Sequence, residues 1–232
     1  MSDQVLKPFP VDPEVLSRIR TMGRADVNDV ARLHRAAMGV SLWSQLGERF
    51  LRTLYRCLIS HPDFRGFVYE ESGRIRGFIA GSTNGKRMFR ELFMRRAPVL
   101  LLTALPGLLR RPLLARHLLG TTSYFSRTRV RIGEEVVAES MFCSFEPDLR
   151  GVRVSGLINK VLFDEMAAMG HRYLKITTEI DNLGAVRQLT SWGFKRLGEF
   201  DFYGKRMLVW RLDLLNNERV EPVRRHLASE VK

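Results

Sequence analysis

One carboxylate, Glu139, lies near the start of an apolar segment, residues 137–145, whose composition predicts a β-strand. Pro147 and Asp148 end that segment, and residues 150–156 then open an amphipathic helix. A turn from strand to helix directs unpaired backbone N–H groups and the positive end of a helix dipole at one point, which suits a phosphate or pyrophosphate. A carboxylate beside such an anion site indicates proton transfer next to a phosphorylated cofactor. This is the arrangement of an enzyme rather than of a scaffold protein.

Two short motifs follow this turn along the chain. Asn182 and Ala185 form an Asn-x-x-Ala pattern at the start of a predicted helix, which ends near the pair Gly193 and Phe194. In this order, the strand of Glu139, the turn and the two motifs resemble the GNAT superfamily of acyl-CoA-dependent N-acyltransferases. The strand itself is similar to that of GNAT-type histone acetyltransferases, in which the matching Glu is the general base. The resemblance implies an α/β fold: a mixed, strongly twisted sheet of six or seven strands with helices on both faces.

N-acylation needs few catalytic groups, because the thioester is already activated. The enzyme must hold the amine, remove its proton and stabilise the developing oxyanion. The resemblance implies direct attack by the amine, with Glu139 as general base acting directly or through one water. The alternative is a structural carboxylate paired with an Arg of the insertion at residues 84–133, and Glu134 and Glu135 are rival bases. Many family members have a Tyr as general acid at the position where this chain has Leu189. Either CoA therefore leaves as its thiolate, or another hydroxyl, such as that of Tyr203, protonates the leaving sulfur.

The pyrophosphate loop keeps part of the family pattern Arg/Gln-x-x-Gly-x-Gly/Ala. Arg150 matches the first position, whereas Arg153 and Ser155 replace the two small residues. Gly151 and Gly156 keep the turn open, so we expect the main-chain N–H groups of the loop to bind pyrophosphate. Arg153 either adds a charge contact to the phosphate or marks a decayed site.

The strand before the loop is expected to contact the cofactor through its backbone. In GNAT proteins this strand separates from its neighbour, often at a β-bulge, and its N–H and C=O groups bond pantetheine like an extra strand. Transfer generally passes directly from thioester to amine, so Cys143 is not expected to be a nucleophile. The predicted cofactor-binding residues are Cys143, Ser144, Phe145, Arg150, Gly151, Val152, Arg153, Val154, Ser155, Gly156 and Asn182.

The composition is that of a soluble globular protein, because 45% of the 232 residues are hydrophobic and 27% are charged. The formal net charge of +13 fits nucleic acid, an anionic membrane surface or an acidic ligand such as CoA. We expect no nucleic-acid partner, because no recognisable module is present. The five histidines show no metal-ligand spacing, so no metal is assigned. Two isolated cysteines, and no signal peptide or run of roughly 18 apolar residues, predict a cytoplasmic protein.

The expected elements form one domain, with a lead-in before it and a polar tail after it. The predicted boundaries are residues 1–17 for the lead-in, 18–215 for the domain and 216–232 for the tail. Asp26 is expected to cap the first helix, either Asp181 or Asn182 the last one, and Gly170 to end the helix between them. The predicted strands outside the Glu139 strand are residues 18–22, 66–70, 75–82 and 173–178, with a closing hairpin at 200–212. One continuous helix is expected at residues 41–60.

Residues 84–133 form an insertion that the common GNAT core lacks. The segment contains eleven Lys or Arg and one acid, Glu91, among many leucines. Pro98, Pro106 and Pro112 are expected to divide it into short helices. The alternatives for its role are packing on its own domain or on the second copy of a homodimer, a lid over the acceptor pocket, and a peripheral contact with a membrane surface. Transmembrane insertion is not expected, because charged residues interrupt the apolar run.

The predicted function is transfer of an acyl group, most simply acetyl, from acetyl-CoA to a primary amine of a small molecule. The long insertion resembles that of bacterial GNAT proteins associated with surface polysaccharides, so an amino sugar is the first acceptor to consider. Transfer to a protein N-terminus or lysine is the second interpretation. The third is a non-catalytic acyl-CoA binder, because Arg153 and Leu189 depart from the family pattern.

Overall fold

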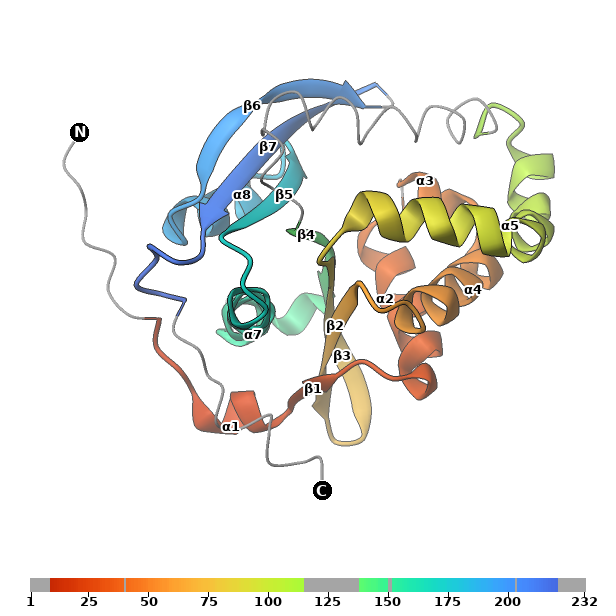
Figure 1. Ribbon diagram of the computed structural model, residues 1–232. Coiled ribbons are helices and arrows are strands. Elements are labelled where there is room, and N and C mark those ends of the chain that lie inside the picture. Colours follow the sequence, from red (N-terminus) through yellow and green to blue (C-terminus); the bar gives the residue numbers. More distant parts are fainter. Residues whose placement is uncertain (1–8, 40, 115–137, 150–151, 203, 221–232) are drawn as a thin grey trace.

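The computed structural model describes residues 9–39, 41–114, 138–149, 152–202 and 204–220. Within these residues seven strands form one twisted sheet in the order β1-β2-β3-β4-β5-β7-β6, in which β4 and β5 are parallel and all other neighbours antiparallel (Figure 1). This confirms the expected mixed sheet. The strands are β1 (Ile19–Thr21), β2 (Phe64–Glu71), β3 (Arg74–Ser82), β4 (Ala138–Phe145), β5 (Tyr173–Glu179), β6 (Lys195–Phe202) and β7 (Lys205–Asp213).

Helices cover both faces of the sheet, and each face has its own apolar core (Figure 1). Helices α2, α4 and α5 pack on one face around Leu54, Phe78 and Met88. Helix α7 packs on the other face, where Phe163 contacts Trp192 at the end of α8. The helices are α1 (Pro13–Ser17), α2 (Val27–Ala37), α3 (Leu42–Gln45), α4 (Glu48–Ile59), α5 (Gly85–Arg110), α7 (Val154–Ala168) and α8 (Leu183–Ser191), with 3-10 turns η1 (Arg24–Asp26) and η2 (Pro147–Leu149).

The turns and caps agree with the strand and helix ends expected from sequence. Ser72 and Gly73 have φ values of 52° and 73° and connect β2 to β3, the positive-φ pair that a tight hairpin favours. Gly170, with φ of 86°, follows the end of α7. Asn182, rather than Asp181, caps α8, because its side-chain oxygen accepts a 3.1 Å hydrogen bond from the backbone N–H of Ala185.

Two predictions about the first helices are wrong in detail. Asp26 does not cap α2 with its side chain. Its carboxylate instead accepts a 2.8 Å hydrogen bond from the backbone N–H of Gly23, which closes turn η1, and forms a bidentate ion pair with Arg20. The helix expected at residues 41–60 is two helices, α3 and α4. Gly47 separates them with φ of 101°, a conformation that interrupts helical hydrogen bonding and that L side chains rarely adopt.

The insertion is also more regular than expected up to residue 110. Helix α5 continues through Pro98 and Pro106 instead of breaking at them. A proline inside a helix loses one backbone hydrogen bond and bends the axis locally, and tertiary packing can offset that cost. Here residues on both sides of Pro98, such as Leu92 and Leu100, are buried in the same core. The remainder of the insertion, from residue 115, lies outside the described residues.

Described residues of the predicted lead-in and of the predicted tail contact the domain. Phe9 stacks on Trp192 with ring centroids 4.8 Å apart, and Leu16 of α1 is buried in the α7-side core. At the other end, the Asn217 side chain donates to the Trp192 carbonyl at 2.7 Å, and Val220 is buried in the same core. The described parts of the lead-in and of the tail therefore pack on the domain.

Candidate active site

Strands β4 and β5 pair over only three residues and then separate. The parallel register joins Ala138 to Leu174, Glu139 to Lys175 and Ser140 to Ile176, and no further pair is found between the described parts of the two strands. On the other edge of β4 the register with β3 shifts between Ala80 and Gly81, so that Met141 is an extra, bulged residue. The expected separation at a bulge is thus present, and it leaves a V-shaped opening between two adjacent strands.

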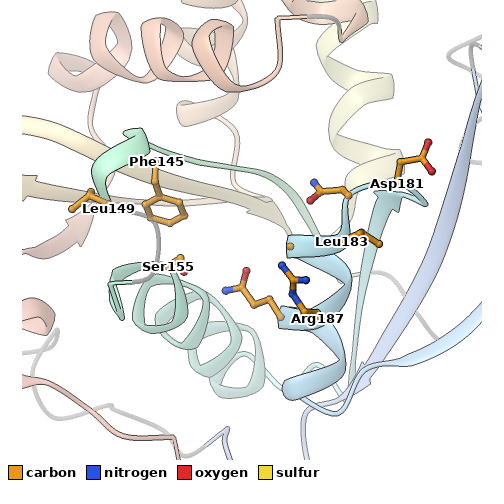
Figure 2. Close-up of a pocket in the computed structure, with 9 residues that line it drawn as sticks. Phe145, Leu149, Ser155, Asp181, Leu183 and Arg187 are labelled. Atoms are coloured by element: carbon orange, nitrogen blue, oxygen red, sulfur yellow. The ribbon is translucent and has the colours of Figure 1, made fainter.

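A pocket of about 670 Å³ lies at the open end of this V. It is bounded by the end of β4, the turn η2, the first turn of α7 and the start of α8. Figure 2 shows Phe145 and Ser155 on one side and Arg187 on the other. Its lining residues are Phe145, Leu149, Ser155, Asp181, Asn182, Leu183, Gly184, Arg187 and Gln188.

The start of α7 provides the donors that an anion requires. Among the hydrogen bonds between described residues, the helical bonds of α7 begin with the N–H of Leu157, which donates to the Arg153 carbonyl at 3.0 Å. The N–H groups of the first turn precede these bonds. The cap residue Arg153 makes no side-chain capping bond and is exposed. Half-buried Ser155 reaches the pocket. The first turn of α7 can therefore bind a phosphate group through its backbone.

Helix α8 lines the opposite wall with side chains that the sequence analysis did not assign. Leu183, Gly184, Arg187 and Gln188 are spaced one and four residues apart, which places them on one face of the helix. Arg187 is an exposed cation on that face. In the sequence, the signal for a role of Arg187 was its closeness to the predicted Asn182. The fold is needed to show that this face of α8 lies opposite α7.

Glu139 lies in the paired part of β4, at the closed end of the V. Its carboxylate oxygen is 2.8 Å from the ammonium nitrogen of Lys175, directly opposite on β5. Both side chains are buried, with 6% and 8% of their surface exposed. Among the described residues, the cation next to Glu139 is thus a lysine, and the insertion from residue 115, with its further arginines, lies outside the described residues. Neither residue lines the pocket of about 670 Å³.

The other predicted residues of β4 face opposite sides of the sheet. Cys143 packs on the α7-side core, and burial raises the pKa of its thiol to about 12, which leaves little thiolate and agrees with a non-nucleophilic role. Ser144 donates its hydroxyl to the Leu33 carbonyl at 3.0 Å on the α2 side. Phe145 is the one of the three whose side chain lines the pocket.

Several predicted loop residues do not present their side chains to the pocket. Val154 is buried in the α7-side core, and Val152 is 47% exposed. A Cβ atom on Gly156 would lie 2.4 Å from the ring of Phe9, so this glycine is needed for close packing with the N-terminal segment. Any cofactor contact by these residues would come from their backbone.

Some predicted residues cannot be placed. Arg150, Gly151, Tyr203, Glu134 and Glu135 lie outside the described residues. Leu189, at the position where many relatives carry a Tyr, is buried in the core and does not line the pocket. Among the described residues no group of three or more His, Cys, Asp or Glu could hold a metal ion.

Comparison with known proteins finds no matching family model and no matching curated protein. Solved structures do match. An N-acetyltransferase from Staphylococcus aureus Mu50 has 15% identity and a TM-score of 0.55, covering 84% of this chain and 96% of its own. A ribosomal-protein-alanine N-acetyltransferase from Brucella melitensis has 14% identity and a TM-score of 0.55, covering 84% and 98%. A variant of spermidine N-acetyltransferase from Vibrio cholerae has 15% identity and a TM-score of 0.52, covering 84% and 94%.

These neighbours share the sheet and helices of this chain over most of its length, at an identity too low to carry over a substrate. The chain has the fold of the GNAT N-acetyltransferases.

Proposed function

We propose that the chain is an N-acyltransferase that moves an acyl group, most simply acetyl, from acyl-CoA to a primary amine. The observation that carries the proposal is the separation of β4 from β5 beyond Ser140, with a pocket at the open end. A parted parallel pair offers backbone groups to an extended ligand in the way a missing strand would. The fold of N-acetyltransferases supports the same reading.

The pocket suits the phosphate-bearing end of the cofactor. The first turn of α7 supplies backbone donors, Ser155 a hydroxyl, and Arg187 a cation on the opposite wall. Phe145 and Leu149 supply apolar surface. The pantetheine arm would run from there along β4 toward the point where the strands meet, which brings the thioester near Glu139.

The proposed reaction is direct. The neutral amine attacks the thioester carbonyl, a C–N bond forms, the C–S bond breaks, and CoA leaves as its thiolate. Glu139 accepts the amine proton, directly or through one water, and that proton then returns to solvent. Lys175 holds the Glu139 carboxylate in place through their 2.8 Å contact. Whether Tyr203 protonates the thiolate stays a prediction, because the residue lies outside the described residues.

The acceptor proposed first is an amino sugar, and a protein N-terminus or lysine is second. Names of the structural neighbours include both a protein alanine and the polyamine spermidine as acceptors, so this fold accommodates large and small amines. A non-catalytic acyl-CoA binder is the remaining candidate, favoured by the exposed Arg153 in the loop and the buried Leu189. The proposed setting is the cytoplasm, where acyl-CoA is available.

Calorimetry tests the cofactor site. Acetyl-CoA should bind, and Arg187→Met should weaken it roughly tenfold through loss of a charged hydrogen bond to phosphate. Binding of acetyl-pantetheine, which lacks the nucleotide and its phosphates, should not change. Arg172→Met, which removes an exposed arginine outside the pocket, is the matched control. Absence of acetyl-CoA binding at millimolar concentration would mean a decayed site.

A thiol-release screen tests catalysis. Amino sugars, nucleotide-linked amino sugars, peptides with free N-termini and polyamines are offered with saturating acetyl-CoA. Release of CoA that depends on one class of amine identifies the acceptor. Tight acetyl-CoA binding without release for any amine would favour the non-catalytic binder.

A further inference from the structure

The second half of α5 has an exposed apolar face. Leu101, Leu102, Leu105 and Leu109 are 59%, 67%, 48% and 75% exposed. Their spacings of one, three and four residues place them on one side of the helix. Pro106 lies within the same exposed stretch. Large contiguous apolar surfaces of this kind on a folded protein indicate interaction with a partner or a membrane.

The opposite side of the same half is packed on the domain. Leu100, Thr103, Ala104 and Gly107 are buried there. A Cβ atom on Gly107 would lie 2.6 Å from the carbonyl oxygen of Leu46, so the helix backbone approaches the segment after α3 closely. The exposed leucines therefore lie on the side of α5 that faces away from the described part of the domain.

Arginine pairs bound the apolar face at both ends. Arg95 and Arg96 precede it, Arg110 and Arg111 follow it, and all four are exposed. From residue 92 to residue 133 the sequence contains no Asp or Glu. Arg95 also lies 3.9 Å from Glu91, and Arg111 donates a 2.7 Å hydrogen bond to the Gln45 side chain. The charge next to the leucines within α5 is nevertheless positive on balance, and it complements an anionic surface.

We propose that this face of α5 binds the surface of a membrane that contains anionic lipids. The helix lies in the plane of the interface, its leucines enter the boundary between head groups and acyl chains, and its arginine pairs contact lipid phosphates. This inference goes beyond acyl transfer and does not depend on it. The surface is named here the α5 face: Leu101, Leu102, Leu105 and Leu109 with the two arginine pairs.

Two other occupants fit the charges and the packing less well. By length and composition alone α5 could cross a membrane, because an 18-residue window has a mean hydropathy of 1.4, whereas the sequence analysis did not expect transmembrane insertion. In the structure 28% of that window is buried. Spanning would require α5 to leave α4 and expose the core around Leu54 and Met88. A second copy of the chain would place arginine pairs against arginine pairs if two α5 faces met, which is unfavourable.

Vesicle co-sedimentation tests the proposal with the full chain. The protein should bind vesicles of equal parts phosphatidylcholine and phosphatidylglycerol, and binding to phosphatidylcholine alone should be far weaker. Arg110→Gln/Arg111→Gln should reduce partitioning roughly 30-fold. Lys195→Gln/Arg196→Gln removes the same charge from an exposed pair on β6 and should change partitioning much less. Salt at about 1 M should release the bound protein.

A second pair of variants, one test and one control, measures the contribution of the apolar side chains to vesicle binding. Leu109→Ser should weaken vesicle binding at least roughly tenfold, whereas Leu215→Ser, at a leucine that is 63% exposed outside α5, should not. Acetyl-CoA affinity and the thermal unfolding midpoint should remain unchanged in all four variants. Equal binding to both kinds of vesicle, or equal losses in test and control variants, overturns the proposal.

Two further outcomes would also overturn it. The first is failure of the wild-type protein to bind anionic vesicles. The second is a dimer in solution that Leu109→Ser converts to a monomer, which would identify the α5 face as a contact between copies. Light scattering on the same samples distinguishes this case.

Discussion

Glu139 and Lys175 lie opposite each other on β4 and β5, and their buried ion pair limits what a substitution at either position can mean. Removing one partner of a buried pair costs about 3–5 kcal/mol of stability, because the other charge loses compensation. A loss of activity in a Glu139 variant alone would therefore not separate catalysis from folding. Variants at both positions are needed.

We predict different kinetics for the two variants. Glu139→Gln should lower kcat by roughly 10² to 10⁴-fold, because the proton acceptor is gone, and the loss should be smaller at high pH, where neutral amine is abundant. Lys175→Gln breaks the same ion pair but keeps the carboxylate, so it should lower the thermal unfolding midpoint similarly and kcat much less. Thiol release and thermal denaturation measure both. Equal losses of kcat would indicate that Glu139 has a structural role.

His34 gives a second prediction at this scale, about stability. The side chain is fully buried on α2, its Nδ1 lies 2.7 Å from the Tyr55 hydroxyl, and Phe78 and Phe142 flank it. Burial lowers the pKa of His34 to about 4. Since the unfolded histidine titrates near 6.5, the unfolded chain binds more protons between pH 6.5 and 4, and stability falls as the pH falls through that window.

The loss attributable to His34 should reach about 3 kcal/mol by pH 4. Urea unfolding between pH 7 and pH 4 measures the slope, and His34→Met should flatten it. The slope is the decisive quantity, because the substitution also removes the bond to Tyr55. The pKa of His171 is also lowered by burial, so part of the pH dependence should remain in the variant. An unchanged slope would refute the assignment.

Among the elements, those with local determinants were predictable from sequence. Gly170 ends α7 and Asn182 caps α8 because each requirement is met within a few residues. The break at Gly47 was missed, because the leucine periodicity continues across it. Pro98 was expected to end a helix, and only packing of both sides of the helix into one core explains why it does not.

The residues of the candidate site also divide into those predictable from local sequence and those that depend on the fold. Phe145, Ser155 and Asn182 were predicted and line the pocket. Arg187 was missed because its relevance depends on where α8 lies relative to α7, and β5 separates these helices in the chain. The lysine opposite Glu139 was missed for the same reason. Strand pairing decides which residue of β5 meets β4, and no local pattern encodes it.

The start of α5 yields a prediction at the scale of elements. Arg87 in the first turn of α5 forms a bidentate ion pair with Asp63, which is 3% exposed and precedes β2. The Arg87 guanidinium holds the pKa of Asp63 below its ordinary value. A depressed carboxyl pKa contributes stability that is present above about pH 4 and is lost as the pH falls through the folded-state value.

Arg87→Met should therefore destabilise the protein at neutral pH, because Asp63 stays buried without its main cation. The difference from wild type should shrink in acid, as Asp63 becomes protonated. Arg90→Met, at an exposed arginine one turn along α5, is the control and should have little effect. A deficit of stability that stays constant from pH 7 to pH 3 would contradict the ion-pair explanation.

At the scale of the whole molecule, the formal net charge of +13 acts on every charged substrate. Charges on exposed residues act over about 8 Å at physiological ionic strength. Lys86 and Arg90 are exposed in the first turns of α5, which begins three residues after Ser82, the β3 partner of Glu139. This places positive charge near the closed end of the V, where we propose that the amine reacts. We therefore predict that an anionic acceptor is attracted there and a polyamine repelled, whereas one of the solved structures with this fold is a spermidine N-acetyltransferase.

The salt dependence of KM tests this, with acetyl-CoA kept saturating so that its own charge does not contribute. For an anionic primary amine, KM should rise with salt because the attraction is screened; for spermidine it should fall; for a neutral amine it should stay flat. Lys86→Gln/Arg90→Gln should reduce both slopes, whereas Lys195→Gln/Arg196→Gln on β6 should leave them nearly unchanged. If all three amines respond alike, salt acts on the protein or on the cofactor rather than on acceptor attraction. The shape of the site would then have to select the acceptor. The positive charge of the molecule would instead serve the binding of the α5 face to an anionic membrane surface, as we propose above.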